Sequence, residues 1–198
     1  MRLILASRSP QRRAILEQAG IPFEVVPADL EELAEGGPAI VAGENARRKA
    51  LAVAALPAAS GALVLGVDTV VALDGRLYGQ PAGREEALAT LGALSGRTHE
   101  VLSGVALATG GEQAALREAV AVTKVTFRAL SPAEIGRYAD TGEWRGRAGA
   151  YAIQQRGATL VDRIEGDYLN VVGLPLATLL ELEPGLRSMP QPPCRRRA

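Results

Sequence analysis

The segment from Leu5 to Arg13, which reads L-A-S-R-S-P-Q-R-R, gathers groups that bind anions. Ser9 is a good helix N-cap and a proline follows it, so the free N–H groups and the positive end of a helix dipole are expected at this turn. Ser7 and Ser9 add hydroxyl donors, and Arg12 and Arg13 add positive charge. The segment is typical of a phosphate-binding turn, although a capped helix with surface arginines is the simpler interpretation.

Two carboxylates could complete such a site. Asp68 follows the apolar run A-L-V-L-G-V at 62–67, and an acid at the carboxyl end of a buried strand lies where open α/β sheets bind ligands. A carboxylate there holds a divalent metal or accepts a proton from water; a turn or helix-cap acid is the alternative. Glu32 lies in the acidic run from Asp29 to Glu35, in which most side chains are expected to be merely solvated.

Lys49 is one of only two lysines among 22 basic residues. In a chain this rich in arginine, a lysine indicates a need for a compact ammonium group, or is retained by chance. Together with Arg12, Glu32 and Asp68 it would supply what phosphoryl chemistry on a triphosphate requires: cations, carboxylates for magnesium or manganese, and a group that orients water. Spacing alone does not prove that the four side chains converge.

Four further side chains have more ordinary interpretations. His99 is the only histidine, so it cannot form a histidine-based metal site, and a structural role is expected. Trp144 and Tyr151 flank a Gly-rich stretch, where packing is favoured over contact with a base. Cys194 is the only cysteine, which excludes an internal disulfide and a cysteine-based zinc site.

The elements that must position these residues alternate between strands and helices. Strands are expected at 2–6, 21–26, 62–67 continued by 70–73, 76–78, 100–108, 119–128 and 158–164. Helices are expected at 11–19, 39–56, 84–94, from the Ser131 cap to about 141, and near 174–182. Strands interspersed with helices, plus the long pair joined at Gly110-Gly111, predict an α/β fold with a mixed sheet.

The charge is unevenly distributed along a chain whose formal net charge is zero. The Pro/Arg-rich tail, 184–198, holds four arginines and no acid and is expected to be disordered, which leaves 18 bases against 22 acids in residues 1–183. An acidic body argues against a nucleic-acid partner. No apolar run approaches the roughly 20 residues that span a bilayer, and the N-terminus lacks a signal-peptide pattern. We therefore expect a cytoplasmic protein without a membrane partner.

Ordered motifs from Leu3 to about Leu182 resemble the Maf family of nucleoside triphosphate pyrophosphatases, relatives of the inosine triphosphatase (Ham1) fold. The motifs are L-A-S-R-S-P-Q-R-R at 5–13, A-D-L-E-E at 28–32, A-R-R-K-A at 46–50, G-V-D-T-V-V at 66–71, L-S-G-R-T-H-E-V at 94–101, W-R-G-R-A-G-A-Y-A-I-Q at 144–154 and N-V-V-G-L-P-L at 170–176. The resemblance implies one catalytic domain, 1–183, in which a twisted mixed sheet is flanked by helices in two lobes with a central cleft.

The resemblance also implies a homodimer that hydrolyses a nucleoside triphosphate between its α and β phosphates with a divalent cation, Mg²⁺ or Mn²⁺. By position, phosphate binding falls to Ser7, Ser9, Arg12, Lys49 and the residue at Gln80. Glu32 would help to hold the metal. Asp68 would be the catalytic base or a further metal ligand.

Residues that divide the family by substrate imply the branch that acts on dTTP and UTP, with modified uridine nucleotides as further candidate substrates. Thr69 after the aspartate and Gln154 in the A-Y-A-I-Q motif resemble that branch, whereas the 7-methyl-GTP branch tends to have Gln and Glu there. Gln11 departs from both, since the pyrimidine branch typically has Arg at this position and the other branch Trp. A 7-methyl-GTP-preferring enzyme therefore stays open as an alternative.

A second departure concerns the cations. The family usually has Lys in a G-K-P motif, where this chain has Gly79-Gln80-Pro81. Losing a charged hydrogen bond costs about 1.5–3 kcal/mol, unless another cation such as Arg76 or Arg84 substitutes. Gln80 keeps open a second hypothesis, a nucleotide-binding regulator of septum formation that has lost catalysis. For the enzyme, the family implies a role in limiting incorporation of unwanted nucleotides and a link to cell division.

Overall fold

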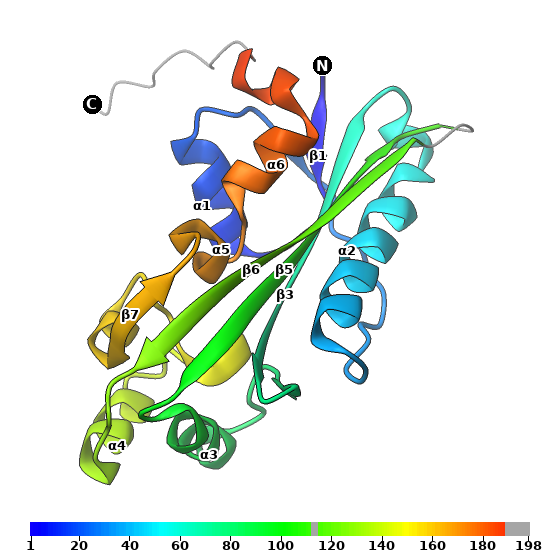
Figure 1. The fold of residues 1–198 in the computed structure, drawn as a ribbon. Helices are drawn as coiled ribbons and strands as arrows, with labels where there is room; N and C mark the ends of the chain where they lie inside the picture. The colour runs from blue at the N-terminus through cyan, green and yellow to red at the C-terminus, as the bar shows by residue number, and fades with distance from the viewer. Residues whose placement is uncertain (112–114, 189–198) are drawn as a thin grey trace.

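The computed structural model describes residues 1–111 and 115–188 and contains a seven-stranded sheet with helices on both faces (Figure 1). The strands are β1 (Leu3–Leu5), β2 (Glu24–Val25), β3 (Leu63–Leu73), β4 (Arg76–Tyr78), β5 (Thr98–Thr109), β6 (Leu116–Phe127) and β7 (Val161–Glu165). The helices are α1 (Pro10–Gln18), α2 (Pro38–Ala54), α3 (Arg84–Leu94), α4 (Pro132–Asp140), α5 (Tyr168–Val172) and α6 (Leu176–Leu182).

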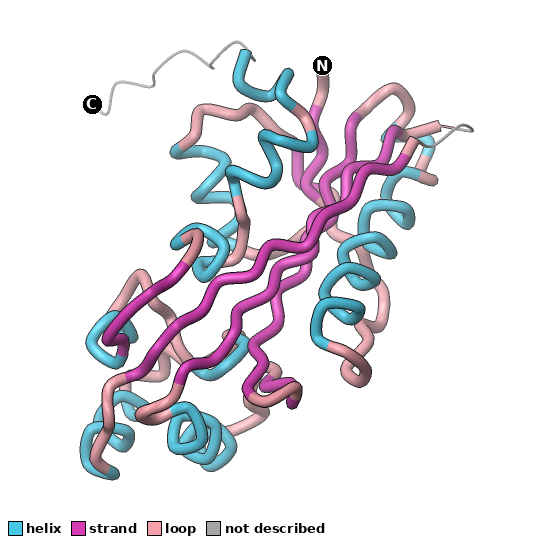
Figure 2. The backbone as a smooth tube through the Cα atoms, viewed as in Figure 1, coloured by secondary structure: helices cyan, strands magenta, loops and turns pink. Residues whose placement is uncertain are grey.

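The sheet is mixed, as the sequence predicts. Its order is β2-β1-β3-β5-β6-β7, with β4 paired to β3. β1 runs parallel to β2 and β3, whereas the remaining pairs are antiparallel. The three long strands β3, β5 and β6 cross the molecule side by side and give it its length (Figure 2).

Helix α2 covers one face of the long strands at unusually short range. A Cβ atom on Gly66 would lie 2.1 Å from the carbonyl oxygen of Ala46, and one on Gly104 would lie 2.1 Å from that of Ala42. Side chains are therefore excluded from both strand positions, and the small residues of α2 rest on the strand backbones. This close approach holds the polar residues of α2 against β3.

Successive side chains of a strand point to opposite faces of the sheet. The residues that point away from α2 therefore pack against the other helices. Ile4 and Val64 pack with the apolar residues of α2. Their neighbours Leu5 and Leu65 instead pack with residues of α1 and α6, such as Leu16 and Leu179. Figure 1 shows α1, α5 and α6 together on that side.

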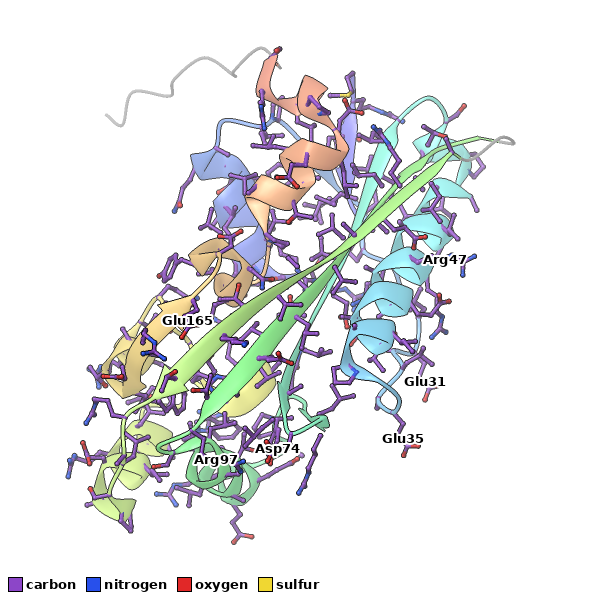
Figure 3. The ribbon with its side chains drawn as sticks, in the orientation of Figure 1. Glu31, Glu35, Arg47, Asp74, Arg97 and Glu165 are labelled. Atoms are coloured by element: carbon purple, nitrogen blue, oxygen red, sulfur yellow. The ribbon has the colours of Figure 1, made fainter. Side chains whose placement is uncertain are left out.

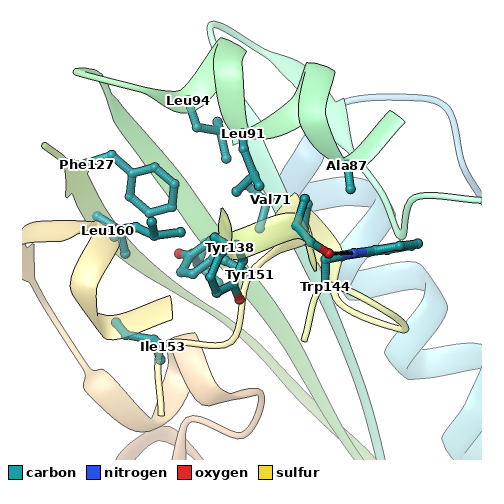
Figure 4. Close-up of a cluster of buried hydrophobic side chains, with 14 of the residues drawn as sticks. Val71, Ala87, Leu91, Leu94, Phe127, Tyr138, Trp144, Tyr151, Ile153 and Leu160 are labelled. Atoms are coloured by element: carbon teal, nitrogen blue, oxygen red, sulfur yellow. Dashed lines mark hydrogen bonds between the residues drawn. The ribbon is translucent and has the colours of Figure 1, made fainter. Parts of the chain in front are cut away.

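A third apolar cluster lies at the far end of the long strands, where α3, α4 and β7 gather. Phe127, Tyr138, Trp144, Tyr151 and the leucines of α3 form its centre (Figure 4). The serine that caps α4 forms the reciprocal capping box with Glu134, which explains why this helix begins as expected.

Three expectations about the elements need correction. The predicted strand 21–26 is reduced to the two residues of β2, and α5 was not expected at all. The predicted tail begins at 184, but Pro184–Ser188 form a 3-10 helix whose Leu186 is buried in the core of the α1 side. Residues 189–198, with Cys194, lie outside the described residues. The segments 62–67 and 70–73 form one continuous strand, β3, as expected.

In the described parts of the chain, none of the helices combines the length and the apolar character needed to cross a membrane.

Candidate active site

A cavity of about 860 Å³ opens between the two ends of the molecule and brings the predicted site residues together. The predicted residues that line it are Ser7, Ser9, Gln11, Arg12, Glu32, Lys49, Asp68, Thr69, Gln80 and Gln154. They come from the β1–α1 turn, the first turn of α1, the β2–α2 segment, α2, β3, the segment after β4 and the stretch before β7. Ser7 and Gln154, which are 147 positions apart in the sequence, thus line the same cavity.

The cavity lies where one edge of β3 has no neighbouring strand. β1 pairs with β3 only as far as Leu65, and β4 pairs with it from Val71 onward. Asp68 therefore lies in the middle of a continuous strand and not at a strand end, which corrects the prediction. The site lies instead at the carboxyl end of β1. Because β1 ends at Leu5, the edge of β3 beside Asp68 has no neighbouring strand.

Lys49 bridges the two predicted carboxylates. Its Nζ lies 2.6 Å from Asp68 Oδ1 and 2.5 Å from Glu32 Oε1. The side chains of Lys49 and Asp68 are each 8% exposed, and that of Glu32 is 52% exposed. The neighbouring acids Glu31 and Glu35 point outward from the same segment (Figure 3), so Glu32 is the acid of the run that pairs with Lys49.

Arg12 is buried on the opposite side of the β3 edge. Its Nε donates to the Gly173 carbonyl at 3.0 Å, its Nη1 to Ser7 Oγ at 2.9 Å and its Nη2 to Thr69 Oγ1 at 3.3 Å. Burial lowers the pKa of the Arg12 guanidinium, while the carboxylates of Asp68 and Glu32 oppose this shift. Arginine stays charged in proteins, so Arg12 presents a fixed cation at the cavity.

The N-terminal turn of α1 is organised by its two serines. Ser9 Oγ accepts from the Arg12 N–H at 3.5 Å and donates to Gln11 Oε1 at 3.1 Å. Ser7 Oγ accepts from the Ser9 N–H at 3.2 Å as well as from Arg12. Arg13 is exposed and does not line the cavity, so one of the two predicted arginines faces away.

The remaining predicted residues occupy distinct parts of the wall. Thr69 Oγ1 lies 2.9 Å from Ser103 Oγ, which fixes its hydroxyl between that serine and Arg12. Gln80 and Gln154 are exposed at the rim.

The two cations suggested as substitutes at position 80 are engaged elsewhere. Arg76 lies over the Tyr78 ring, 5.2 Å from its centroid, and Arg84 pairs with Asp140 at 2.7 Å. Neither lines the cavity, which corrects that suggestion.

Two cavity-lining residues were missed by the sequence reasoning. Asn45, one turn before Lys49 in α2, donates to Asp68 Oδ2 at 3.1 Å. Its helical spacing from Lys49 was the available signal. Arg147 lines the cavity with a buried Nε that has no hydrogen-bond partner among the described residues. The Gly149 N–H donates to the Gly79 carbonyl at 3.2 Å, which holds this arginine-bearing stretch next to Gln80.

The aromatic and histidine side chains pack as expected. Trp144 is buried and donates its Nε1–H to the Ala139 carbonyl at 2.8 Å. His99 Nε2 lies 3.0 Å from Tyr151 OH, and burial lowers the pKa of His99 to about 4. Tyr151 also lines the cavity, so it belongs both to the core and to the site wall, and burial raises the pKa of its hydroxyl.

The chain is similar to known proteins along most of its length. The family described as "Maf-like protein" matches residues 2–183. A "dTTP/UTP pyrophosphatase" of Symbiobacterium thermophilum is 48% identical over 91% of both chains, and one of Myxococcus xanthus is 50% identical over 91% of this chain and 90% of its own. A "Nucleoside triphosphate pyrophosphatase" of Xylella fastidiosa is 44% identical over 91% of this chain and 96% of its own.

Among solved structures, a HAM1 protein from Coxiella burnetii superimposes with a TM-score of 0.49 at 17% identity, covering 81% of this chain and 91% of its own. The family match and the curated relatives each span nearly the whole chain, and the motifs on which the resemblance rests surround the cavity. The chain belongs to the Maf family.

Proposed function

We propose that this protein is a nucleoside triphosphate pyrophosphatase that hydrolyses dTTP and UTP to the monophosphate and pyrophosphate. The observation that carries the proposal is the convergence of Arg12, Lys49, Glu32 and Asp68 on one cavity. Relatives at 48% and 50% identity over most of both chains carry the name dTTP/UTP pyrophosphatase, which supports the same activity.

The chemistry follows from the positions of the charged groups. A water molecule attacks the α-phosphorus, the bond from this phosphorus to the bridging oxygen of the β-phosphate breaks, and pyrophosphate leaves. Asp68 orients the water and accepts its proton, because it lines the cavity beside the unpaired part of β3. Arg12 and Lys49 stabilise the charge on the leaving pyrophosphate, together with the free N–H groups of the α1 turn.

A divalent cation, Mg²⁺ or Mn²⁺, fits the carboxylates of this site. Glu32 and Asp68 accept from the same ammonium group, so both lie within reach of one cation. In residues 1–111 and 115–188, no cluster of three or more His, Cys, Asp or Glu side chains offers a complete metal site; Mg²⁺ usually binds one or two carboxylates plus substrate phosphates. When bound, the cation would neutralise charge on the phosphate oxygens.

We propose that side chains lining the cavity determine which nucleotide is preferred. Thr69, held by Ser103 and Arg12, and Gln154 occupy the positions that distinguish the pyrimidine branch. Gln11, turned toward the Ser9 hydroxyl, belongs to neither branch pattern. We therefore expect dTTP and UTP to be preferred over 7-methyl-GTP, with modified uridine triphosphates as possible further substrates.

The decisive assay measures pyrophosphate release from dTTP, UTP, CTP and 7-methyl-GTP with Mg²⁺ or Mn²⁺. Wild-type protein is compared with Asp68→Asn, which keeps the shape of the side chain and removes its charge. We expect release from dTTP and UTP and a loss of roughly 10³-fold in the variant, within the range of general acid–base catalysis. Equal rates in the two proteins would contradict the proposal, and preference for 7-methyl-GTP would contradict the branch assignment alone.

Gln80 favours a second candidate, a regulator of septum formation that binds nucleotides without cleaving them. The exposed amide at the cavity rim stands where the family usually places an ammonium group. Nucleotide binding by calorimetry, with no pyrophosphate release from any of the four nucleotides, would support this candidate over the enzyme.

We propose that the enzyme acts in the cytoplasm as a homodimer and limits incorporation of unwanted nucleotides, with an effect on cell division. Analytical ultracentrifugation tests the dimer, and the nucleotide pools of cells lacking the protein test its cellular role.

A further inference from the structure

The carboxamide of Asn45 connects three separate parts of the site. Asn45 lies on α2 and is 1% exposed. Its Oδ1 accepts from the Leu33 N–H at 2.8 Å, and its Nδ2 donates to the Leu33 carbonyl at 3.0 Å and to Asp68 Oδ2 at 3.1 Å. Both amide protons and the amide oxygen therefore have partners, and each partner lies in another segment.

The segment that Asn45 holds carries Glu32. Residues 27–36 contain no helix or strand, and within the described chain they make no backbone hydrogen bond to another backbone group. Their polar side-chain contacts are the Asn45 pair to Leu33, the ion pair from Lys49 to Glu32 and an exposed pair between Arg8 and Asp29. Asn45 thus fixes the backbone one residue after Glu32.

The same amide also orients Asp68. Lys49 occupies Asp68 Oδ1, and Asn45 donates to Asp68 Oδ2. The carboxylate is therefore held through both oxygens, with its plane set by two residues one helical turn apart on α2. Such outer partners orient the groups that touch a metal or substrate, and their loss typically costs 10–100-fold in metal affinity or activity.

We propose that Asn45 is a positioning residue that sets the separation of Glu32 and Asp68, and so determines how well the two carboxylates share one divalent cation. The inference rests on the function proposed above. An aspartate at this position would repel Asp68 and lose both donors, and an alanine would release Leu33 and leave Asp68 with Lys49 alone. A role confined to stability predicts that these changes lower the melting temperature and nothing else.

The test compares Asn45→Ala with Asn170→Ala in the full chain. Asn170 is also a fully buried amide, which donates to the Val101 carbonyl at 3.0 Å and to Thr123 Oγ1 at 2.9 Å, and it does not line the cavity. Three quantities are measured: Mn²⁺ affinity by electron paramagnetic resonance, hydrogen–deuterium exchange of residues 27–37, and kcat and KM for dTTP as a function of Mn²⁺ concentration.

We expect Asn45→Ala to weaken Mn²⁺ binding about tenfold, to speed exchange in residues 27–37, and to lower kcat about tenfold or more with KM for dTTP changed less than about threefold. Asn170→Ala should lower the melting temperature and leave these quantities at wild-type values. Wild-type Mn²⁺ affinity and kcat in Asn45→Ala would overturn the inference. If wild-type protein binds Mn²⁺ but cleaves no nucleotide, the proposed function fails, and the affinity and exchange data still decide the role of Asn45.

Discussion

The ammonium group of Lys49 forms a buried ion pair with Asp68, with 2.6 Å between Nζ and Oδ1. The same nitrogen lies 2.5 Å from Glu32 Oε1, so one positive charge holds two carboxylates together. A divalent cation bound by these carboxylates would take over this neutralising role. For the proposed enzyme we therefore expect Lys49 to supply, between Glu32 and Asp68, the positive charge that a divalent cation would otherwise supply.

Lys49→Met should unbalance this arrangement, because it leaves a buried carboxylate without its cation. We expect the free energy of unfolding to fall by about 3 kcal/mol, the lower end for breaking a buried ion pair, as measured by urea denaturation without divalent ions. We also expect tighter Mn²⁺ binding in the absence of nucleotide, since the competing ammonium is gone.

The other lysine, Lys124, is exposed on β6, so Lys124→Met should change stability by less than about 0.5 kcal/mol. Equal stability and equal Mn²⁺ affinity in the two variants would show that Lys49 does not compete with metal.

Gln80→Lys should raise kcat/KM for dTTP. The position lines the cavity at its rim, and a charged hydrogen bond to phosphate contributes about 1.5–3 kcal/mol, which corresponds to roughly tenfold or more in rate. Steady-state kinetics over a range of dTTP concentrations provides the measurement. An unchanged rate would mean that the charge at position 80 is not limiting and that a neighbouring cation, for which Arg147 is the candidate, already fills this role.

His99 makes the stability of the protein depend on pH. Burial lowers its folded-state pKa to about 4, against 6.5 for the ordinary side chain. The unfolded chain therefore binds the proton more tightly, and stability present above pH 6.5 is lost as the pH falls toward 4. Between pH 7.5 and pH 5 this amounts to about 2 kcal/mol.

Urea denaturation at the two pH values measures this loss. His99→Gln, which cannot be protonated in this range, should lack the histidine's share of it. The same decrease in wild-type and variant protein would assign the pH dependence to other groups.

Gly66→Ala should destabilise the fold and disturb the site together. The added Cβ would lie 2.1 Å from the Ala46 carbonyl oxygen, so α2 must move away from β3, carrying Lys49 with it. We expect a loss of about 3 kcal/mol in thermal or urea unfolding, the upper part of the usual overpacking range, and a lower kcat. Gly92, exposed in α3 with open space at its Cβ position, provides the control: Gly92→Ala should stabilise by about 0.5–1 kcal/mol. A neutral Gly66→Ala would show that α2 does not depend on this close approach.

Local sequence signals predicted the helices that begin at a capping side chain. Ser9 and Ser131 cap helices that begin as expected, because a side-chain oxygen satisfies the first free N–H groups wherever the chain turns. The strand at 21–26 was overestimated, since Ile21 and Phe23 pack on the α1 side while only Glu24 and Val25 pair with β1. Helix α5 was missed because five residues give no periodic pattern.

The sequence predicted which residue types form the site but not how they are arranged in space. The sequence places Asp68 after an apolar run, yet only the pairing of β1 and β4 along β3 determines which part of that strand stays open. Asn45 was passed over because an asparagine within a helix has no chemical signature of its own. Its role emerges from the distance to Leu33 and Asp68, which depends on how closely α2 rests on Gly66 and Gly104.

The most direct test of the account follows the products of dTTP hydrolysis in ¹⁸O-labelled water by ³¹P nuclear magnetic resonance. Attack of water at the α-phosphorus predicts dTMP that carries one ¹⁸O atom, together with unlabelled pyrophosphate, and almost no product with Asp68→Asn. Formation of dTDP and labelled inorganic phosphate, labelled pyrophosphate, or turnover that survives the Asp68 substitution would contradict the proposed reaction.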